Sequence, residues 1–204
     1  MPTSTFFNLP REKRVKILRS AEAEFSRKPC GEVSINRIIQ AADIPRGSFY
    51  QYFSGKTDLF HYLLHCCSQG MESILLESLD ACGGSLLDLP LVLFDRAAAQ
   101  IREDGGELRA MLAIVRQNAG LDLGQVWDPA AMTRTVLGRA ELSGLALSGP
   151  EEAFTLLDLL LSSTAQAFAA ICCGKLTEAE SRRRLTQKTA LLRRAVEHKE
   201  DHPC

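Results

Sequence analysis

The feature that most constrains the fold of this chain is the spacing of its apolar side chains, which recur every three or four residues along most of its length. The pattern is clear near the N-terminus, in Val15, Leu18, Ala21 and Phe25. This spacing places the apolar groups on one face of an α-helix. Alternating runs of β-branched residues joined by hairpin turns, which indicate a sheet, are not evident. The sequence therefore predicts an all-α protein.

Four helices are expected in the first part of the chain, at about residues 10–25, 34–42, 45–53 and 54–75. The second is expected to end at Asp43, because Pro45 disfavours helical angles in the residue before it and Asp tolerates the left-handed conformation of a tight turn. Ser34 and Ser54 are suitable N-caps for the second and fourth helices. Two further helices are expected at about residues 150–173 and 178–197. Each start fits a capping box, in Ser148 with Glu151 and in Thr177 with Glu180.

Charge is distributed unevenly along the chain of 204 residues, whose formal net charge is −1. Residues 1–60 hold ten Lys or Arg against six Asp or Glu, a balance of +4, and the remainder holds fourteen against nineteen, a balance of −5. The N-terminal quarter is therefore the part that suits a polyanion such as DNA.

The seven cysteines show no spacing typical of a disulfide framework, and the N-terminal residues do not resemble a secretory signal. Reduced thiols and a cytoplasmic location are expected. The stretch at residues 155–173 is almost long enough to span a membrane. Because it contains Asp158 and Gln166, we expect a buried helix there and no membrane partner.

Two short helices joined by a tight turn after a longer helix form a helix-turn-helix, whose second helix enters the major groove of DNA. Here the second short helix lies in the sequence RGSFYQYFSGK, residues 46–56, which has four aromatic rings within five residues. Phe49 and Phe53 are four residues apart and share a face, so we expect them to pack near Phe25 and Ile38.

The other residues of this stretch suit contacts with DNA. Arg46, Gly47 and Ser48 occupy the helix N-terminus, where Arg can pair with guanine, Ser can donate or accept, and Gly permits a close approach. Gln51 is a candidate reader of adenine.

Tyr50 and Tyr52 are expected to point away from the core, with hydroxyls that donate to phosphate oxygens. Lys56 lies in the first turn of the next helix, where free N–H groups and the helix dipole favour an anion. We expect it to hold a phosphate.

From Ile17 to Leu64 the chain resembles the DNA-binding domain of the TetR family of transcriptional regulators. The resemblance rests on motif elements in order: a first helix ending in AEAEF, then Gly31, VSINRIIQAADI, the tyrosine-rich helix, and Phe53-x-x-Lys56-x-x-Leu59. It implies phosphate contacts from Ser34, Asn36, Tyr50, Tyr52 and Lys56, and groove contacts from Arg46, Gly47, Ser48 and Gln51. For Ser34 and Asn36, helix capping alone is an equal alternative. Asp43 departs from the family, which usually has glycine in this turn.

The resemblance also implies two domains, a DNA-binding domain at residues 8–56 and a helical domain at residues 57–204 that binds an effector and forms a homodimer. The last two helices, with several small residues around Ala167, are expected to form a four-helix bundle with a second copy. A dimeric helix-turn-helix protein reads a palindromic operator, with half-sites about 34 Å apart or a multiple of that distance.

After Gly84 the chain is expected to continue as further helices, and an apolar pocket for a small-molecule effector is expected among these middle helices. Its candidate lining is Phe60, Leu64, Cys67, Met71, Phe94, Met111, Trp127, Met132, Phe154 and Phe168. Ordinary core packing is the alternative for each of these residues. The link between pocket and DNA is expected to be the long fourth helix.

Other functions have less support. No nucleophile motif, phosphate loop or HExxH pattern indicates an enzyme, and no cofactor is expected. His61, His65 and Cys66 could bind zinc only if further ligands converged on them, so we expect no metal site. The sequence therefore predicts a ligand-responsive repressor that binds DNA. The alternative is a helical sensor or adaptor that does not read a specific DNA sequence.

Overall fold

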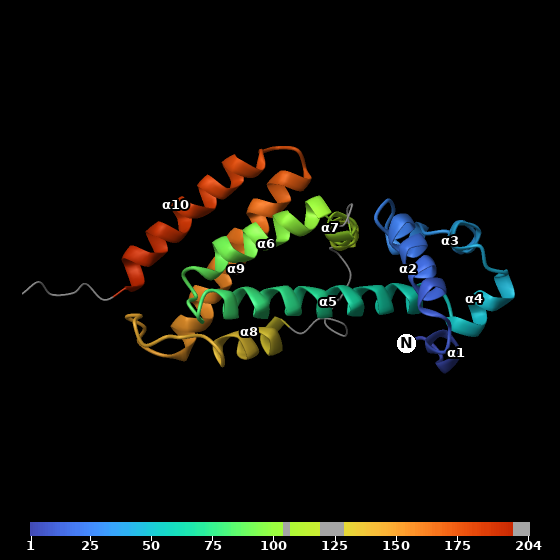
Figure 1. The fold of residues 1–204 in the computed structure, drawn as a ribbon, viewed down its shortest axis with the longest axis horizontal. Coiled ribbons are helices and arrows are strands. Elements are labelled where there is room, and N and C mark those ends of the chain that lie inside the picture. The colour runs from blue at the N-terminus through green and yellow to red at the C-terminus, as the bar shows by residue number, and fades with distance from the viewer. Residues whose placement is uncertain (104–106, 119–128, 198–204) are drawn as a thin grey trace, which may run out of the picture. The chain divides into compact units, whose positions relative to one another are not determined.

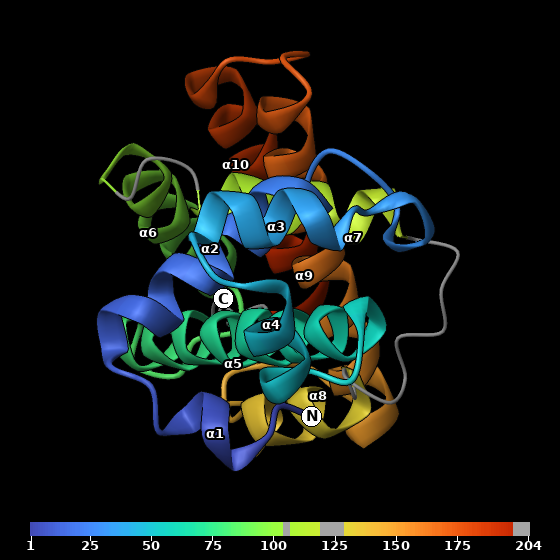
Figure 2. The same ribbon diagram turned by 90° about the vertical axis from the view of Figure 1, so that its right-hand side faces the viewer.

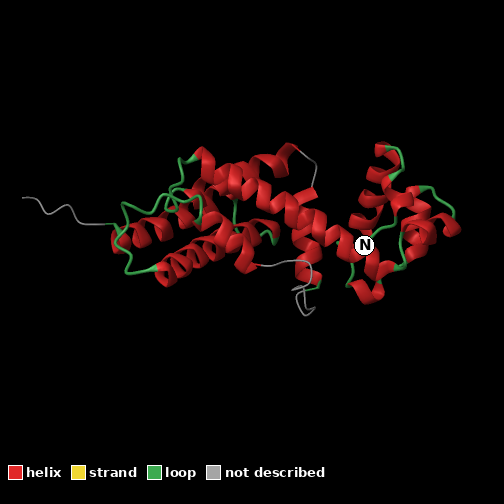
Figure 3. Cartoon of the chain, turned by 90° about the horizontal axis from the view of Figure 1, so that it is seen from below, coloured by secondary structure: helices red, strands yellow, loops and turns green. Residues whose placement is uncertain are grey.

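The computed structural model describes residues 1–103, 107–118 and 129–197. Among these residues the regular structure is helical and no β-strand is found (Figure 3). The prediction of an all-α protein is confirmed.

Figure 1 shows the helices of the described residues in chain order. They are α1 (Ser4–Phe7), α2 (Arg11–Phe25), the short 3-10 helix η1 (Cys30–Glu32), α3 (Ile35–Ala42), α4 (Arg46–Tyr52), α5 (Lys56–Ala81), α6 (Leu89–Glu103), α7 (Glu107–Gln117), α8 (Pro129–Leu137), α9 (Pro150–Cys172) and α10 (Glu178–Val196). The helices expected at both ends of the chain correspond to α2 to α5, α9 and α10. Neither α1 nor η1 was expected, because helices of three or four residues are too short to show a periodic pattern.

The chain divides into two compact units, the first made of residues 1–71 and 105–128 and the second of residues 72–104 and 129–204. Each domain expected from the sequence, residues 8–56 and 57–204, is one continuous segment of the chain. Each compact unit instead combines two separate segments. Helix α7 is far along the chain but packs on α2, and Ile114 of α7 is fully buried in the N-terminal core. The first part of α5 is also in this unit.

The core of the first unit is rich in aromatic rings. Phe49 and Phe53 are fully buried in the same cluster as Phe25 and Ile38, which confirms the packing expected for them. The ring of Phe25 also lies 5.1 Å from that of Phe60, on α5. These contacts fix α3, α4 and the beginning of α5 around α2.

The turn between α3 and α4 has the conformation that the sequence predicted. Asp43 lies in the left-handed region, with φ 56° and ψ 52°. The N–H of Ile44 donates to the carbonyl of Ile39 at 3.0 Å, which closes the end of α3. Pro45 then precedes α4, and its fixed φ suits the entry into that helix.

One of the two predicted capping boxes is present. Thr177 and Glu180 form it at the start of α10. At the start of α9 the prediction was wrong, because Gly149 is the N-cap residue and no side chain caps the helix. There the backbone N–H of Ser148 donates instead to the carboxylate of Glu152 at 2.7 Å.

In the second unit, α6, α8 and α10 all pack on α9. Helix α9 is, by length and composition, the one helix among the described residues that could cross a membrane, a test that core helices also pass. Leu157 and Leu160 of α9 are fully buried in the core of this unit. At the surface, the guanidinium of Arg182 binds the carboxylate of Asp95 through two bonds of 2.7 and 2.8 Å.

Candidate nucleic-acid interface

The helix-turn-helix consists of α3, the turn at Asp43 and α4, which follow α2 in the N-terminal unit (Figure 2). Helix α4 has only seven residues. Its buried side is formed by Phe49 and Tyr52. The residues expected to meet bases lie on the other side or at its N-terminus, where Arg46 and Gly47 are exposed and Ser48 is half-buried.

Arg46 is held in place by two side chains. One terminal nitrogen of its guanidinium donates to the Asn36 side-chain oxygen, on α3, at 2.7 Å. The guanidinium carbon also lies 5.9 Å from the centre of the Tyr50 ring, within the range of a cation–π contact. The remaining N–H groups of Arg46 have no hydrogen-bond partner in the described part of the chain. They are available to two acceptors on a guanine edge.

Tyr50 is 47% exposed, which agrees with the direction expected for it. The rings of Tyr50 and Phe49 pack edge to face, with their centroids 5.3 Å apart. Gln51 is also exposed. The buried Phe49 ring thus supports the Tyr50 ring. The Tyr50 and Gln51 side chains are both on the solvent side of α4.

Tyr52 lies elsewhere than expected. It is 4% exposed, and its ring is 6.2 Å from that of Phe6 in α1. Helix α1 has only four residues and was not expected from the sequence, so the Phe6 ring that covers this side of α4 was not expected either. Tyr52 belongs to the core of the unit, together with Phe53.

Gly47 is not required by the fold. A Cβ atom at this position would meet no heavy atom within 4 Å. A glycine inside a helix costs about 0.5–1 kcal/mol of stability relative to alanine. Close approach of an external group to the backbone is a reason to place glycine there.

Lys56 is tied to the backbone before α3. Its ammonium group donates to the carbonyl of Gly31, and lies 3.4 Å from the carbonyl of Val33. These bonds fix the start of α5 against the segment that leads into α3. They also keep a positive charge beside the first turn of α5, where the backbone N–H groups favour an anion.

The capping role considered for Ser34 is not observed. Ser34 is the N-cap residue of α3, but its side chain makes no capping hydrogen bond. Its backbone N–H points instead to the carboxylate of the buried Glu24, at 3.5 Å. Asn36 also does not cap α3, since its side chain accepts from Arg46.

The charge of Asp43 is partly offset by its neighbour. The ammonium group of Lys16, on α2, lies 3.7 Å from the Asp43 carboxylate, and both side chains are largely exposed. Exposed pairs of this kind contribute at most about 1 kcal/mol of stability. Near a DNA backbone, Lys16 reduces the repulsion that Asp43 alone would cause.

The residues expected to line an effector pocket fall into both compact units. Phe60, Leu64 and Met111 are buried in the first unit and Phe94 and Phe168 in the second. Cys67, Met71, Met132 and Phe154 are partly buried, and Trp127 lies outside the described residues. Phe94 and Phe168 stack at 5.0 Å, so this pair fills space in the core of the second unit.

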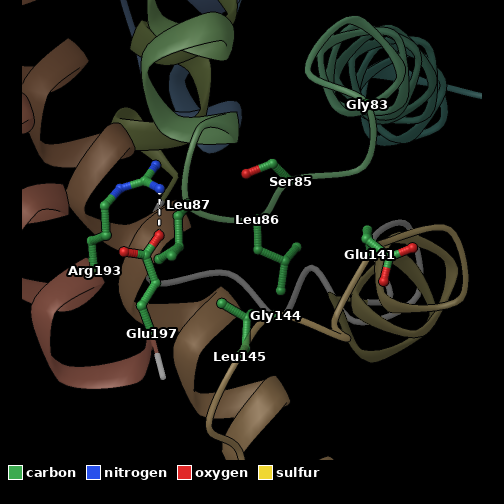
Figure 4. A pocket seen from close by; sticks show the side chains of 9 residues that line it. All are labelled: Gly83, Ser85, Leu86, Leu87, Glu141, Gly144, Leu145, Arg193 and Glu197. Atoms are coloured by element: carbon green, nitrogen blue, oxygen red, sulfur yellow. Dashed lines mark hydrogen bonds and ion pairs between the residues drawn. The ribbon is translucent and has the colours of Figure 1, made fainter. Parts of the chain in front are cut away.

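The second unit contains a small cavity (Figure 4), and none of the residues that line it is among those expected from the sequence. Its volume is about 210 Å³. Its lining includes the apolar Leu86, Leu87 and Leu145 and the charged Arg193 and Glu197. The Arg193 guanidinium binds Glu197 and Asp88 at 2.6 Å each, so its charge is already balanced. Ligand pockets usually measure about 300–1,000 Å³, and this cavity suits only a very small ligand.

The thiols near the middle of α5 are protected by burial. Burial raises the pKa of Cys67 to about 12, and the charges of Glu22 and Cys66 act in the same direction. Burial also raises the pKa of Cys66. Both side chains therefore remain neutral thiols near pH 7. Among the described residues, no group of three or more His, Cys, Asp or Glu side chains is arranged to hold a metal ion.

The fold and this interface define an all-helical protein with an N-terminal helix-turn-helix, the architecture of DNA-binding regulators. Residues 17–63 match the family model for bacterial regulatory proteins of the tetR family. The N-terminal domain of this chain is therefore a TetR-family domain, and the predicted resemblance is confirmed.

Solved structures share the fold of this chain over nearly its whole length. A TetR family transcriptional regulator from Chloroflexus aurantiacus is 24% identical, with a TM-score of 0.57, over 98% of this chain and 100% of that chain. A putative TetR-family transcriptional regulator from Mesorhizobium loti is 18% identical, with a TM-score of 0.67, over 93% and 100%. A gamma-butyrolactone receptor, described as an ArpA-like protein, is 21% identical, with a TM-score of 0.55, over 90% and 97%. At these identities the likeness shows a shared fold.

Proposed function

We propose that this protein is a dimeric transcription regulator of the bacterial cytoplasm, which represses transcription from a palindromic operator until a small apolar effector releases it. The observation that carries the proposal is the position of Arg46, at the exposed N-terminus of α4 and held by Asn36 and Tyr50. An arginine that is ordered before binding loses less conformational entropy when it meets a guanine.

The proposed contacts to bases come from Arg46, Gly47, Ser48 and Gln51. The proposed contacts to phosphates come from Ser34, Tyr50 and Lys56, and from Asn36 in addition to its bond with Arg46. The exposure of Tyr50 supports its place in this set. The burial of Tyr52 argues against a phosphate contact from that residue.

The proposed homodimer forms through α9 and α10. Leu159 on α9 is 46% exposed, and Leu191 on α10 is 65% exposed. Burying such side chains against a second copy removes apolar surface from water. Sedimentation of the parent protein and of Leu191→Glu tests this interface, with Thr186→Glu on the same helix as the control. The proposal predicts a dimer for the parent and the control and a weaker dimer for Leu191→Glu, and a monomeric parent contradicts it.

The proposed effector is a small apolar molecule that binds among the helices after α4. The shared fold with a gamma-butyrolactone receptor supports responsiveness to a small molecule. Helix α5 is the proposed link, because it carries Lys56 at its start and Cys67 and Met71 further along. Release follows to the extent that the effector prefers a form of the dimer with low affinity for DNA.

Selection of bound duplexes from a randomised DNA pool at two salt concentrations tests the proposed DNA binding, with Tyr50→Ala as the control variant. The proposal predicts that the parent enriches a palindrome and that the variant enriches it poorly. Salt-sensitive binding without any enriched sequence overturns it, because phosphate contacts alone produce such binding. That outcome favours a sensor or adaptor.

A further inference from the structure

The recognition helix α4 ends after only seven residues, and, as in any α-helix, its last carbonyl groups have no partners inside the helix. Phe53, the residue that follows, has an extended backbone with φ −136° and ψ 140°. A helix end of this kind frays unless other groups satisfy the carbonyls. In this structure the partners come from the N-terminal segment, residues 1–9, which precedes the part of the chain that matches the family model.

Thr3 binds the end of α4 twice. Its backbone N–H donates to the carbonyl of Tyr52 at 3.0 Å. Its hydroxyl donates to the carbonyl of Gln51 at 2.6 Å. One residue, 48 positions earlier in the chain than Gln51, therefore satisfies the carbonyl of a proposed base reader and the next carbonyl along.

Phe6 anchors the same segment in the core. It is fully buried, and its ring lies 4.8 Å from Phe53 and 5.6 Å from Tyr62. Phe53 follows α4 directly and Tyr62 belongs to α5. The ring of Phe6 thus joins the end of the recognition helix to the helix that follows it.

We propose that the N-terminal segment is a positioning element for sequence readout, in which Thr3 and Phe6 hold the C-terminal half of α4, and with it Gln51, in the orientation that reads a base. This inference rests on the proposed function. Thr3 and Phe6 need not touch DNA, because they act on the backbone and on the rings beneath it. Base contacts set sequence preference and are sensitive to small shifts in position, whereas phosphate contacts supply affinity that is independent of sequence.

The matched pair of variants is Thr3→Val and Thr5→Val. Thr3→Val keeps the shape and the backbone N–H but removes the hydroxyl that donates to Gln51. Thr5 lies in the same segment with an exposed side chain, so Thr5→Val makes the same chemical change without the contact. Phe6→Leu tests the anchor with a smaller loss of volume than alanine would cause. Circular dichroism and thermal unfolding establish that each variant is folded under the conditions of the binding assay.

The measurement uses the duplex that the parent protein enriches from the random pool, together with single base-pair substitutions of it. Thr3→Val is expected to bind this duplex about threefold to tenfold more weakly, and to lose preference mainly at the base pair whose readout is also lost in Gln51→Ala. Adding Thr3→Val to Gln51→Ala is expected to cause little further change. Non-specific affinity and its salt dependence are expected to stay at the parent value, and Thr5→Val is expected to match the parent.

The inference is overturned if folded Thr3→Val and Phe6→Leu bind with the affinity and base preference of the parent. It is also overturned if the folded variants weaken specific and non-specific binding equally, since that result indicates a general effect on DNA binding and no effect on base readout. Failure of the parent to enrich any sequence contradicts the proposed function itself, so the two failures are distinguished by the parent alone.

Discussion

The side-chain oxygen of Asn118 accepts a hydrogen bond of 2.9 Å from the backbone N–H of Cys30, a residue 88 positions earlier in the chain. The amide nitrogen of Asn118 donates to the carbonyl of Ile114 at 2.8 Å. Both bonds are buried. Asn118 therefore joins the end of α7 to the beginning of η1, inside the unit that contains the helix-turn-helix.

Asn118→Ala is expected to destabilise the protein, because it leaves the buried N–H of Cys30 without an acceptor. The expected loss is about 1–3 kcal/mol in the free energy of unfolding. Urea denaturation monitored by circular dichroism measures it. Gln117→Ala, one residue earlier and only half-buried, is the control. Equal midpoints for the two variants would contradict the structural role of Asn118.

Arg46→Ala is expected to reduce affinity for the selected operator by about 1–3 kcal/mol and to relax the preference at one base pair, as for loss of a bidentate contact. Asn36→Ala is expected to cause a smaller loss at the same base pair, because Arg46 then lacks its anchor. Affinities for the two variants and their combination form a double-mutant cycle. Additive losses would show that the Asn36 contact does not serve Arg46 in the complex, and Gln40→Ala on the exposed side of α3 controls for a general effect of that helix.

Gly47→Ala separates folding from binding. No atom blocks the added methyl group in the free protein, so the free energy of unfolding is expected to stay the same or to rise by up to about 1 kcal/mol. Affinity for the operator is expected to fall, because the methyl group occupies space needed for close approach of the helix to DNA. Denaturation and DNA titration on one preparation check both expectations. Full affinity in Gly47→Ala would remove Gly47 from the proposed interface.

Lys56→Gln is expected to lower both the stability of the protein and the salt dependence of its DNA binding, for two separate reasons. Loss of the bonds to Gly31 and Val33 lowers stability. Loss of a phosphate contact reduces the slope of log affinity against log salt by about one. Titrations at several salt concentrations measure the slope. A destabilised variant with the parent slope would make Lys56 a structural residue only.

The stability of the protein is expected to fall between pH 9 and pH 12, in part through Cys67. Its pKa is raised to about 12 by burial, from an ordinary value of 9.0. The unfolded chain therefore ionises first, so the stability from the neutral thiol is complete below pH 9 and is lost as the pH rises toward 12. The slope for one such group is up to about 1.4 kcal/mol per pH unit. Denaturation at pH 9 and pH 11 is expected to show a smaller decrease in Cys67→Ala than in the parent or in Cys173→Ala, and an unchanged decrease would contradict the shift.

The helix-turn-helix was predictable because its signals are local. The turn at Asp43 follows from the proline two residues later and from the tolerance of Asp for left-handed angles, and Phe49 and Phe53 share a face by their spacing alone. The burial of the Tyr52 side chain was not predictable, because it depends on a contact with Phe6, which lies outside the helix and far from it in sequence. The hydrogen bond between Arg46 and Asn36 was not predicted either. The distance between these two side chains depends on how the turn at Asp43 orients α4 relative to α3.

The packing of α7 with the N-terminal helices also could not be predicted from the sequence. Nothing in the pattern of α7 specifies whether Ile114 packs with α2 or with a neighbour in chain order, and the pairing becomes visible only in three dimensions. The capping box at Thr177 was predicted correctly, whereas the one at Ser148 was not, because Gly149 took the N-cap position and Glu152 reached the backbone of Ser148.

Sequence readout by α4 requires the protein to discriminate between two duplexes of equal length and base composition, one selected by the protein and one with the same sequence scrambled. Affinity is measured for both at physiological ionic strength. The selected duplex is expected to bind at least about 1,000-fold more tightly, the lower end of the range for specific regulators, and Arg46→Ala is expected to reduce this ratio of affinities. A ratio near one in the parent protein would contradict sequence readout by α4.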